Sequence, residues 1–429
     1  MWLISATPAL FTDLYELTMA QAYFRQGMDQ AAYFEVFVRH LPEHWGFFVM
    51  AGLPEVESYL RQFRFAPEDI AYLRSTGLFA DDFLEYLSVF ELNVKIRALP
   101  EGTVFFANEP IMEVSGPILH AQLLETYLLN ILGFSIIEAT LAARMMTAAK
   151  GIPIVDFGLR RCQGPISSIR AARGGQIAGF AATSNVFAAK LLAMPPSGTM
   201  AHSFVEAHES EEQAFRDFAQ LYGEKAILLV DTYDSTQGIK TAARVAKDFA
   251  DRGIRIRGIR LDSGDIAALS RLAREHFRRE GLEFLKIFAS GDLDEFRIAH
   301  LLAAGAKIDG LGVGTRFTVS HHAPAIGIVY KIVQYGDRPL YKTSPDKVTR
   351  PGRKTILRKS EIRDLRFEMD TVQPFAPRAD DLLKPFESAE PIATIQQRLQ
   401  HQIAALPDTI KTIQEPTLYR VEFVGFPGT

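Results

Sequence analysis

Three stretches in the middle of the chain decide its fold: residues 226–231 (AILLVD), 254–262 (IRIRGIRLD) and 308–314 (IDGLGVG). Each is a short apolar run that ends at an acid or at small residues, and residues 152–156 (IPIVD) and 285–291 (LKIFASG) repeat the pattern. Segments with apolar positions three and four apart follow most of these runs, at 238–251, 265–279 and 293–304. Short apolar strands that alternate with amphipathic helices indicate parallel β/α units.

The strand ends at Asp231, Asp262, Gly291 and Gly314 are 31, 29 and 23 residues apart, which is the span of one β/α unit. Repeating this unit builds either a doubly wound sheet or a barrel, because a parallel sheet needs both faces covered. Residues 152–317 hold about six units, fewer than the eight of a complete barrel. Both architectures place ligands at the carboxyl ends of the strands. The sequence therefore predicts a site where these polar and glycine residues gather.

The flanks of the chain have a mixed pattern that predicts an α+β domain. Helices are expected at 12–24, 54–63, 67–74, 81–87, 119–132 and 392–405, and strands at 32–39, around Val94, Val104 and Ile111, and after 330. We expect residues 1–134 and 330–429 to form this one domain together. Residues 135–329 would form the inserted β/α domain that carries the site. The predicted fold class is α/β, with an incomplete barrel beside an α+β domain.

Composition and charge exclude several classes of protein. The 429 residues are 48% hydrophobic and 23% charged, which is ordinary for a globular protein and excludes a disordered or collagenous chain. Lys and Arg (47) nearly balance Asp and Glu (51), so the net charge is −4. This balance gives no electrostatic grip on nucleic acid or on an acidic membrane.

The cysteine content and the N-terminus favour a cytoplasmic protein. Cys162 is the single cysteine, which excludes an internal disulfide and fits a reducing compartment. Residues 1–5 (MWLIS) show no basic segment before a long apolar run, so no secretory signal is expected. No uninterrupted apolar stretch approaches ~20 residues, so we also expect no membrane span.

Two clusters carry groups that could bind an anion or take part in catalysis. Arg160 and Arg161 follow Phe157 at a strand end, where guanidinium groups could bind phosphate or carboxylate and the ring could lie against a flat ligand. For this motif in isolation, a surface salt bridge beside a core Phe is the favoured alternative. His202, after Gly198 and Thr199, could act as base, ligand or nucleophile, although most single histidines do not.

Acids and glycines occupy the remaining strand ends. Asp231 and Asp262 could bind Mg²⁺ or sugar hydroxyls, whereas Asp234, Ser263 and Asp265 stand where helix N-caps are expected. Capping and ligand binding are compatible. The turns at Gly291 and at Gly312, Gly314 and Thr315 suit the backbone cradle of a phosphate, although a glycine turn alone is a weak signal. Together the residues favour a magnesium-dependent reaction on a phosphorylated sugar.

The chain resembles a known family, the nicotinate phosphoribosyltransferases. The motifs that carry the resemblance, in order, are residues 12–19 (TDLYELTM), 157–161 (FGLRR), 179–186 (GFAATSNV), 198–204 (GTMAHSF), 260–265 (RLDSGD) and 312–315 (GVGT). They extend over residues 12–315, and the ordered set is far more specific than any single motif.

The resemblance implies an enzyme that converts nicotinate and phosphoribosyl pyrophosphate (PRPP) to nicotinate mononucleotide and pyrophosphate, coupled to ATP hydrolysis, in NAD biosynthesis. It implies a type II phosphoribosyltransferase fold, with an incomplete barrel beside an α+β domain. It also implies a homodimer with composite sites, in which Tyr15 reaches the partner's barrel and stacks on the pyridine ring opposite Phe157.

By the same resemblance, His202 matches the histidine that ATP phosphorylates. Arg160 would hold the pyridine carboxylate or the pyrophosphate, while Arg260 and Asp262 would line the ring pocket and the ribose–Mg²⁺ side. Asp231 would support magnesium or the His202 ring. The turns at Gly291, Gly312, Gly314 and Thr315 would bind the 5′-phosphate.

Substrate choice can be argued from charge. Related nicotinamide enzymes place an aspartate where Ser184 stands here, and that carboxylate would repel nicotinate. The zinc-binding cysteine motif of some relatives is absent, so no zinc is expected. The alternatives are nicotinamide or quinolinate phosphoribosyl transfer, or a non-catalytic, regulatory paralogue that binds the same ligands.

Overall fold

A computed structural model describes residues 8–342, 349–360, 366–386 and 390–426. Residues 1–5, on which the expectation about a secretory signal depends, lie outside this set. The chain forms two compact units, one of Met1–Ile137 with Ala325–Thr429 and the other of Glu138–Pro324. The boundaries expected from the sequence were 134/135 and 329/330.

The unit of residues 138–324 is built on a six-stranded sheet with the order β7-β6-β11-β10-β9-β8. Every pairing in this sheet is parallel. The strands are β6 (Ile154–Asp156), β7 (Ala182–Thr183), β8 (Ile227–Leu229), β9 (Gly258–Leu261), β10 (Lys286–Ala289) and β11 (Gly310–Val313). The five expected apolar runs contain β6, β8, β9, β10 and β11. The pairings of the described residues leave β7 and β8 as the sheet edges, so the barrel-like arrangement is not closed.

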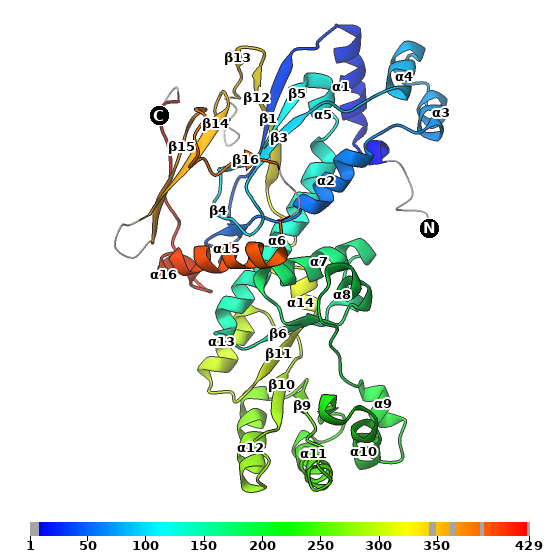
Figure 1. The fold of residues 1–429 in the computed structure, drawn as a ribbon, viewed down its shortest axis with the longest axis vertical. Helices are drawn as coiled ribbons and strands as arrows, with labels where there is room; N and C mark the ends of the chain where they lie inside the picture. The colour runs from blue at the N-terminus through cyan, green and yellow to red at the C-terminus, as the bar shows by residue number, and fades with distance from the viewer. Residues whose placement is uncertain (1–7, 343–348, 361–365, 387–389, 427–429) are drawn as a thin grey trace. The chain divides into compact units, whose positions relative to one another are not determined.

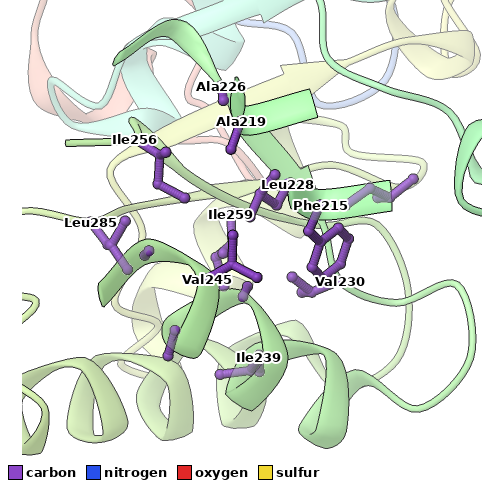
Figure 2. Packing of buried hydrophobic residues seen from close by; sticks show 14 of the residues in the cluster. Phe215, Ala219, Ala226, Leu228, Val230, Ile239, Val245, Ile256, Ile259 and Leu285 are labelled. Atoms are coloured by element: carbon purple, nitrogen blue, oxygen red, sulfur yellow. The ribbon is translucent and has the colours of Figure 1, made fainter. Parts of the chain in front are cut away.

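Helices connect these strands, as the 3.6-residue periodicity predicts. They are α7 (Pro165–Ala178), α8 (Val186–Leu192), α9 (His202–Glu206), α10 (Glu211–Tyr222), α11 (Ser235–Ala250), α12 (Ile266–Arg279), α13 (Glu295–Ala303) and α14 (Thr315–Thr318). The apolar faces of α10, α11 and α12 pack against strands β8 to β10 and bury Phe215, Ile239, Val245 and Ile259 in one core (Figures 1 and 2). Burial of apolar surface in this core stabilises the sheet whose strand ends carry the predicted site residues.

The unit formed by the two flanks is an α+β structure, as expected. Its largest sheet has the order β13-β12-β1-β5-β3-β16, and its pairings are antiparallel. The strands are β1 (Ala31–Val38), β3 (Lys95–Ala98), β5 (Pro110–Pro117), β12 (Ile328–Tyr335), β13 (Arg338–Pro339) and β16 (Lys384–Pro385). Because β1, β3 and β5 come from the N-terminal flank and the other three from the C-terminal flank, the two flanks share one sheet.

The other elements of this unit include two smaller sheets, β2 (Phe48–Val49) with β4 (Val104–Phe105), and β14 (Lys354–Ser360), β15 (Phe367–Pro374) and β17 (Val421–Phe423). Its helices are α1 (Leu14–Arg25), α2 (Leu53–Gln62), α3 (Pro67–Ser75), α4 (Asp81–Ser88), α5 (Ile118–Gln122), α15 (Ile392–Ala405) and α16 (Asp408–Lys411). The chain passes between the two units within α6 (Glu125–Ala149).

Buried ion pairs also join the flanks. The ammonium group of Lys354 donates to both carboxylate oxygens of Glu35, at 2.8 and 2.7 Å. Burial raises the pKa of Glu35 to about 7, against the opposing charge of Lys354. Arg353 likewise pairs with Glu113 at 2.7 Å. Removing one member of such a pair leaves an uncompensated buried charge, so these contacts strongly constrain how the flanks associate.

One helical expectation needs correction. The helix expected at 119–132 is two helices, α5 and α6, and α6 continues to Ala149. Asp13 is the N-cap of α1 but makes no side-chain capping bond; its carboxylate accepts from the Thr126 hydroxyl at 2.6 Å instead.

Among the described residues, one helical stretch, Ile118–Ala149, is long and apolar enough by length and composition to cross a membrane. It is not an uninterrupted apolar run, because polar residues are scattered along it. Within the structure, 72% of its most apolar window is buried, which is also what a core helix of a globular protein shows.

Candidate active site

Most of the predicted site residues of the 138–324 unit lie on loops that leave the same edge of the parallel sheet, while Arg260 and Gly312 lie within β9 and β11 and His202 begins α9. Phe157 follows β6, Ser184 follows β7, Gly291 follows β10 and Gly314 follows β11. Asp231 and Asp262 follow β8 and β9 in the same way. Since the carboxyl ends of parallel strands share one edge, the sheet gathers residues that are distant in sequence.

His202 is the first residue of α9 and is partly exposed, with 42% of its side chain accessible. Its Nδ1 is in hydrogen-bond contact with the Thr232 hydroxyl at 3.1 Å. Its Nε2 lies 3.9 Å from Oδ2 of Asp262. The ring therefore has one nitrogen held by a hydroxyl and the other beside a carboxylate. Thr232, rather than its neighbour Asp231, contacts the ring.

Arg260 is a mostly buried cation of β9 that lies beside this histidine. Its Nη1 donates to the Thr199 hydroxyl at 2.6 Å, and its Nη2 lies 3.7 Å from Oδ2 of Asp262. Its Nε is buried and makes no hydrogen bond. Burial lowers the pKa of Arg260, the charges of Asp262 and Asp231 oppose that shift, and the charge of Arg160 adds to it. The charge of Arg160 is therefore close enough to act on Arg260.

Two carboxylates connect the ends of β8 and β9. Asp231 accepts the Ser263 hydroxyl at 2.5 Å and the Asp262 backbone N–H at 3.2 Å, both at Oδ2. Its other oxygen, Oδ1, is buried without a hydrogen bond. Asp262 accepts a hydrogen bond from the Ser290 hydroxyl at Oδ1 and directs Oδ2 toward Nε2 of His202 and Nη2 of Arg260. The capping alternative applies to Asp234 and Asp265, which cap α11 and α12, while Ser263 instead binds Asp231.

The side chain of Phe157 lies against the end of β11. A Cβ built on Gly312 would come within 2.4 Å of the Phe157 ring, so only glycine fits beneath the ring in this arrangement. The Phe157 N–H donates to the Val313 carbonyl at 2.7 Å, which fixes the backbone that carries the ring. Gly312 therefore positions an aromatic face, whatever other role it has.

The two predicted phosphate turns are neighbours. Gly291 has a φ of 95°, and a Cβ there would lie 2.1 Å from the Asp262 carbonyl oxygen, so the turn requires glycine. Ser290 Cβ lies 3.3 Å from the position of a Cβ on Gly312. Gly314 and Thr315 begin α14, which is four residues long, so its dipole is small. Asp294 already caps α13 by accepting the Arg297 N–H. The expected phosphate binding at these turns would therefore depend on their backbone N–H groups more than on helix dipoles.

Arg160 and Ser184 complete the predicted set in this unit. Arg160 is exposed in the short 3₁₀ helix Leu159–Arg161 and makes a long 3.4 Å contact from Nη1 to the Phe157 carbonyl. Ser184 is half-buried, and its N–H donates to the Asp156 carbonyl at 2.7 Å.

Tyr15 belongs to the other unit, in the first turn of α1, and its side chain is exposed. Partial burial and the negative charges of Glu125 and Glu16 raise its pKa, so the hydroxyl stays protonated.

Several residues of the site received no role from the sequence. Thr199 holds Arg260, and Thr232 holds His202. The charges of Asp231 and Asp234 act on Glu211, which lies at the start of α10. Burial, with those two charges, raises the pKa of Glu211 to about 7. The positions of the two threonines could have indicated a role, because Thr199 follows Gly198 and Thr232 follows Asp231. Nothing in the sequence distinguished Glu211 from its neighbours.

Comparisons with known proteins show the family to which the chain belongs. Residues 10–133 match the model of the nicotinate phosphoribosyltransferase N-terminal domain, and residues 152–356 match the model of the nicotinate phosphoribosyltransferase family. The chain is 47% identical over 353 residues to the nicotinate phosphoribosyltransferase pncB2 of Mycobacterium tuberculosis, which covers 82% of this chain and 76% of the relative. The chain belongs to the nicotinate phosphoribosyltransferase family.

Other members and structures support this assignment. The nicotinate phosphoribosyltransferase of Bacillus subtilis is 42% identical over 82% of this chain and 73% of its own length. The crystal structure of human nicotinic acid phosphoribosyltransferase matches with a TM-score of 0.84 at 28% identity, covering 96% of this chain and 97% of the human one. A nicotinate-nucleotide pyrophosphorylase from Pyrococcus furiosus shares the fold, with a TM-score of 0.75 at 24% identity and coverage of 94% and 98%. The family and the fold class expected from the sequence are thus confirmed.

Proposed function

We propose that this protein is a nicotinate phosphoribosyltransferase that joins nicotinate to the ribose of PRPP and releases pyrophosphate, in NAD biosynthesis. The observation that carries the proposal is the network of His202, Asp262, Arg260 and Thr199 at one end of a parallel sheet, beside the phosphate turns. The names of the relatives supply the substrates. The network supplies the charges that such a reaction needs.

The transfer needs positioning and charge more than a protein nucleophile. As the pyridine nitrogen bonds to C1 of the ribose, the bond from C1 to pyrophosphate breaks and its electrons leave with pyrophosphate. C1 is positively charged during this step, and the Asp262 carboxylate can stabilise that charge. Arg160 and Arg260 can hold the leaving anion or the nicotinate carboxylate. The ring would stack on Phe157.

We also propose that ATP phosphorylates His202. If Nδ1–H donates to Thr232, the lone pair of Nε2 is available on the partly exposed side of the ring. A bond from Nε2 to the γ-phosphorus would form as the bond to ADP breaks, and water would later release phosphate. The resulting phosphohistidine would sit next to Asp262 and Arg260, where its charge acts on the pyrophosphate site.

Mg²⁺ is the metal that we propose for this site. Among the described residues there is no group of three or more His, Cys, Asp and Glu side chains that could hold a metal ion by itself. Mg²⁺ is commonly held by one or two carboxylates together with substrate phosphates. Asp231, with its buried and unbonded Oδ1, and Asp262 fit that role. Bound there with PRPP, the ion would supply charge neutralisation of the pyrophosphate.

We propose nicotinate rather than nicotinamide as the substrate because Ser184 is neutral. An aspartate at this position would accept a hydrogen bond from an amide and repel a carboxylate. Quinolinate carries two carboxylates and would need a denser set of cations than Arg160, Arg161 and Arg260.

A homodimer with composite sites is the assembly that we propose. Tyr15 is exposed in one unit, and α8 of the other unit presents the exposed apolar side chains of Val186, Phe187 and Leu191. Exposed apolar groups that gather on one element are typical of protein interfaces. Tyr15 of one subunit would then stack on the ring bound by its partner. A cytoplasmic location fits the single cysteine.

The proposal is tested by incubating the protein with nicotinate, nicotinamide or quinolinate, each with PRPP and Mg²⁺, with and without ATP. Mass spectrometry of the products should show nicotinate mononucleotide from nicotinate, and more of it with ATP. Binding of nicotinate and PRPP without any mononucleotide would favour a regulatory paralogue. A mononucleotide formed from another acid or amide would favour the corresponding transferase.

A further inference from the structure

Asp156 is a buried acid at the carboxyl end of β6, and the proposed reaction gives it no role. It is the last residue of β6, only 2% exposed, and it precedes the loop that carries Phe157 and Arg160. Its strand lies between β7 and β11 in the sheet. A charge buried at such a position is costly unless hydrogen bonds satisfy it.

Three hydrogen bonds connect Asp156 to two loops. Oδ1 accepts the Gly158 N–H at 2.7 Å, and Oδ2 accepts the Thr183 hydroxyl at 2.7 Å. Its backbone carbonyl accepts the Ser184 N–H, also at 2.7 Å. One residue therefore holds the loop that carries Phe157 and the loop that carries Ser184.

The second loop is fixed further by its own bonds. The Thr183 hydroxyl accepts the Asn185 N–H at 3.0 Å, and Asn185 Nδ2 donates to the Ser168 hydroxyl at 3.0 Å. These groups are all buried. The Thr183 hydroxyl has its hydrogen in one bond and accepts another, so its loss would disturb both the carboxylate and the loop.

A neighbouring carboxyl shows why Asp156 is suited to this position. Glu138 is fully buried, neither of its oxygens has a hydrogen bond, and burial with the Asp156 charge raises its pKa well above the ordinary value. Burial also raises the pKa of Asp156, but its bonds from Thr183 and Gly158 oppose the shift. Of the carboxyls of Glu138 and Asp156, Asp156 is therefore the one that carries the negative charge, because two hydrogen-bond donors stabilise it.

We infer that Asp156 is the positioning residue that sets the separation of Phe157 and Ser184, and hence the width of the pocket for the pyridine ring. The inference rests on the proposed function, since that function places the ring between these loops. Asp156 would not touch the substrate. It would act through Gly158 and Thr183.

The test changes Thr183, whose hydroxyl donates to Asp156, rather than Asp156 itself. Thr183→Val keeps the shape of the side chain but removes the donor, and Thr183→Ser keeps the donor. A hydrogen bond to a charged group is worth ~1.5–3 kcal/mol, so Thr183→Val should raise the KM for nicotinate about tenfold or more. The KM for PRPP should rise much less, because Arg160 is the one proposed PRPP contact on these two loops, whereas the turns at Gly291 and Gly314 and the acids Asp231 and Asp262 lie on others. Thr183→Ser should restore the nicotinate KM.

A second measurement does not depend on turnover. Hydrogen–deuterium exchange of the ligand-free protein should be faster in Thr183→Val than in wild type in peptides covering both 157–161 and 182–186, with Thr183→Ser like wild type. Exchange that is unchanged, or faster in the 182–186 peptide alone, would overturn the inference. So would equal rises in the KM for nicotinate and for PRPP. If the wild-type protein formed no mononucleotide, the proposed function would fail, while the exchange result would still decide whether Asp156 joins the two loops.

Discussion

Arg260 donates a hydrogen bond from Nη1 to the Thr199 hydroxyl at 2.6 Å, and this bond joins two parts of the chain 61 residues apart. Thr199 precedes His202 by three residues, and Arg260 precedes Asp262 by two. The bond therefore holds the loop between α8 and α9, which leads to His202, against β9. The contacts of His202 with Thr232 and Asp262 depend on this placement.

His202→Gln should abolish ATP hydrolysis while leaving slow, ATP-independent transfer, because the phosphorylated nitrogen is lost and the Arg260–Asp262 pair remains. His208→Gln is the matched control, since His208 contacts Asp217 and the Phe204 carbonyl rather than a strand end. Phosphate release and mononucleotide formation are measured side by side. ATP hydrolysis by His202→Gln at the wild-type rate would refute the phosphohistidine role.

Ser184→Asp should lower kcat/KM for nicotinate about a hundredfold or more, because a carboxylate in a desolvated pocket repels a carboxylate substrate. Ser184→Asn is the control of similar size without the charge, and it should lose much less. The ratio of kcat/KM for nicotinate and nicotinamide in the three proteins measures the effect. An equal loss in both variants would show that size, not charge, governs this position.

Gly312→Ala should weaken nicotinate binding and destabilise the fold by about 1–3 kcal/mol, since the new methyl group would displace the Phe157 ring. Gly133→Ala, in α6, is the control, because its new Cβ would make an ordinary 3.4 Å contact with Ile328. Urea unfolding and nicotinate titration of both variants test this. Unchanged stability and affinity in Gly312→Ala would mean that the Phe157 ring does not pack over Gly312.

The adjacent residues Glu211 and Glu212 should respond to pH in different ways. The raised pKa of Glu211 means that its contribution to stability is present below the ordinary carboxyl pKa of ~4.3 and is lost as pH rises through about 7. The stability of Glu211→Gln relative to wild type should therefore increase as the pH rises from 5 to 8. Bonds from Arg216 and Arg244 lower the pKa of Glu212, so its contribution is already present at pH 5.

Thermal unfolding in magnesium-free buffer at both pH values measures this difference. Glu212→Gln should be slightly less stable than wild type by the same amount at pH 5 and pH 8. A Glu211→Gln variant that tracked wild type across the range would show that Glu211 is not forced to ionise near Asp231.

Mixed dimers of Tyr15→Ala and His202→Ala should recover part of the activity that each variant lacks, if each site takes Tyr15 from one subunit and His202 from the other. Tyr72→Ala, which removes an exposed tyrosine from α3, is the control and should remain active alone. The activity of mixtures is compared with that of the separate variants. No recovery after verified subunit exchange would argue for self-contained sites.

The β/α rhythm of the central unit was predictable because its strands are short apolar runs that end at Asp231, Asp262 and Gly291. The lengths of the helices were less predictable. Polar residues such as Glu138 lie within α6, and their burial depends on tertiary packing that no local pattern reveals.

The chemistry of the site was also only partly predictable from the sequence. Residue types at strand ends pointed to Asp231 and Asp262, because parallel strands must bring their ends together, whereas Arg260 was indicated by the family resemblance. The bonds of Thr199, Thr232 and Thr183 connect loops that are far apart in sequence, so only the three-dimensional structure assigns them. Gly312 was expected to cradle a phosphate, whereas its contact with the Phe157 ring shows a steric requirement that the motif does not contain.

The most direct test of the central claim is the ratio of kcat/KM for nicotinate to that for nicotinamide, measured with the wild-type protein, saturating PRPP and Mg²⁺ by the mass of the mononucleotide formed. The account predicts nicotinate mononucleotide and pyrophosphate in equal amounts, with a ratio of about a hundred or more. A ratio near one, or no mononucleotide from nicotinate, would contradict it.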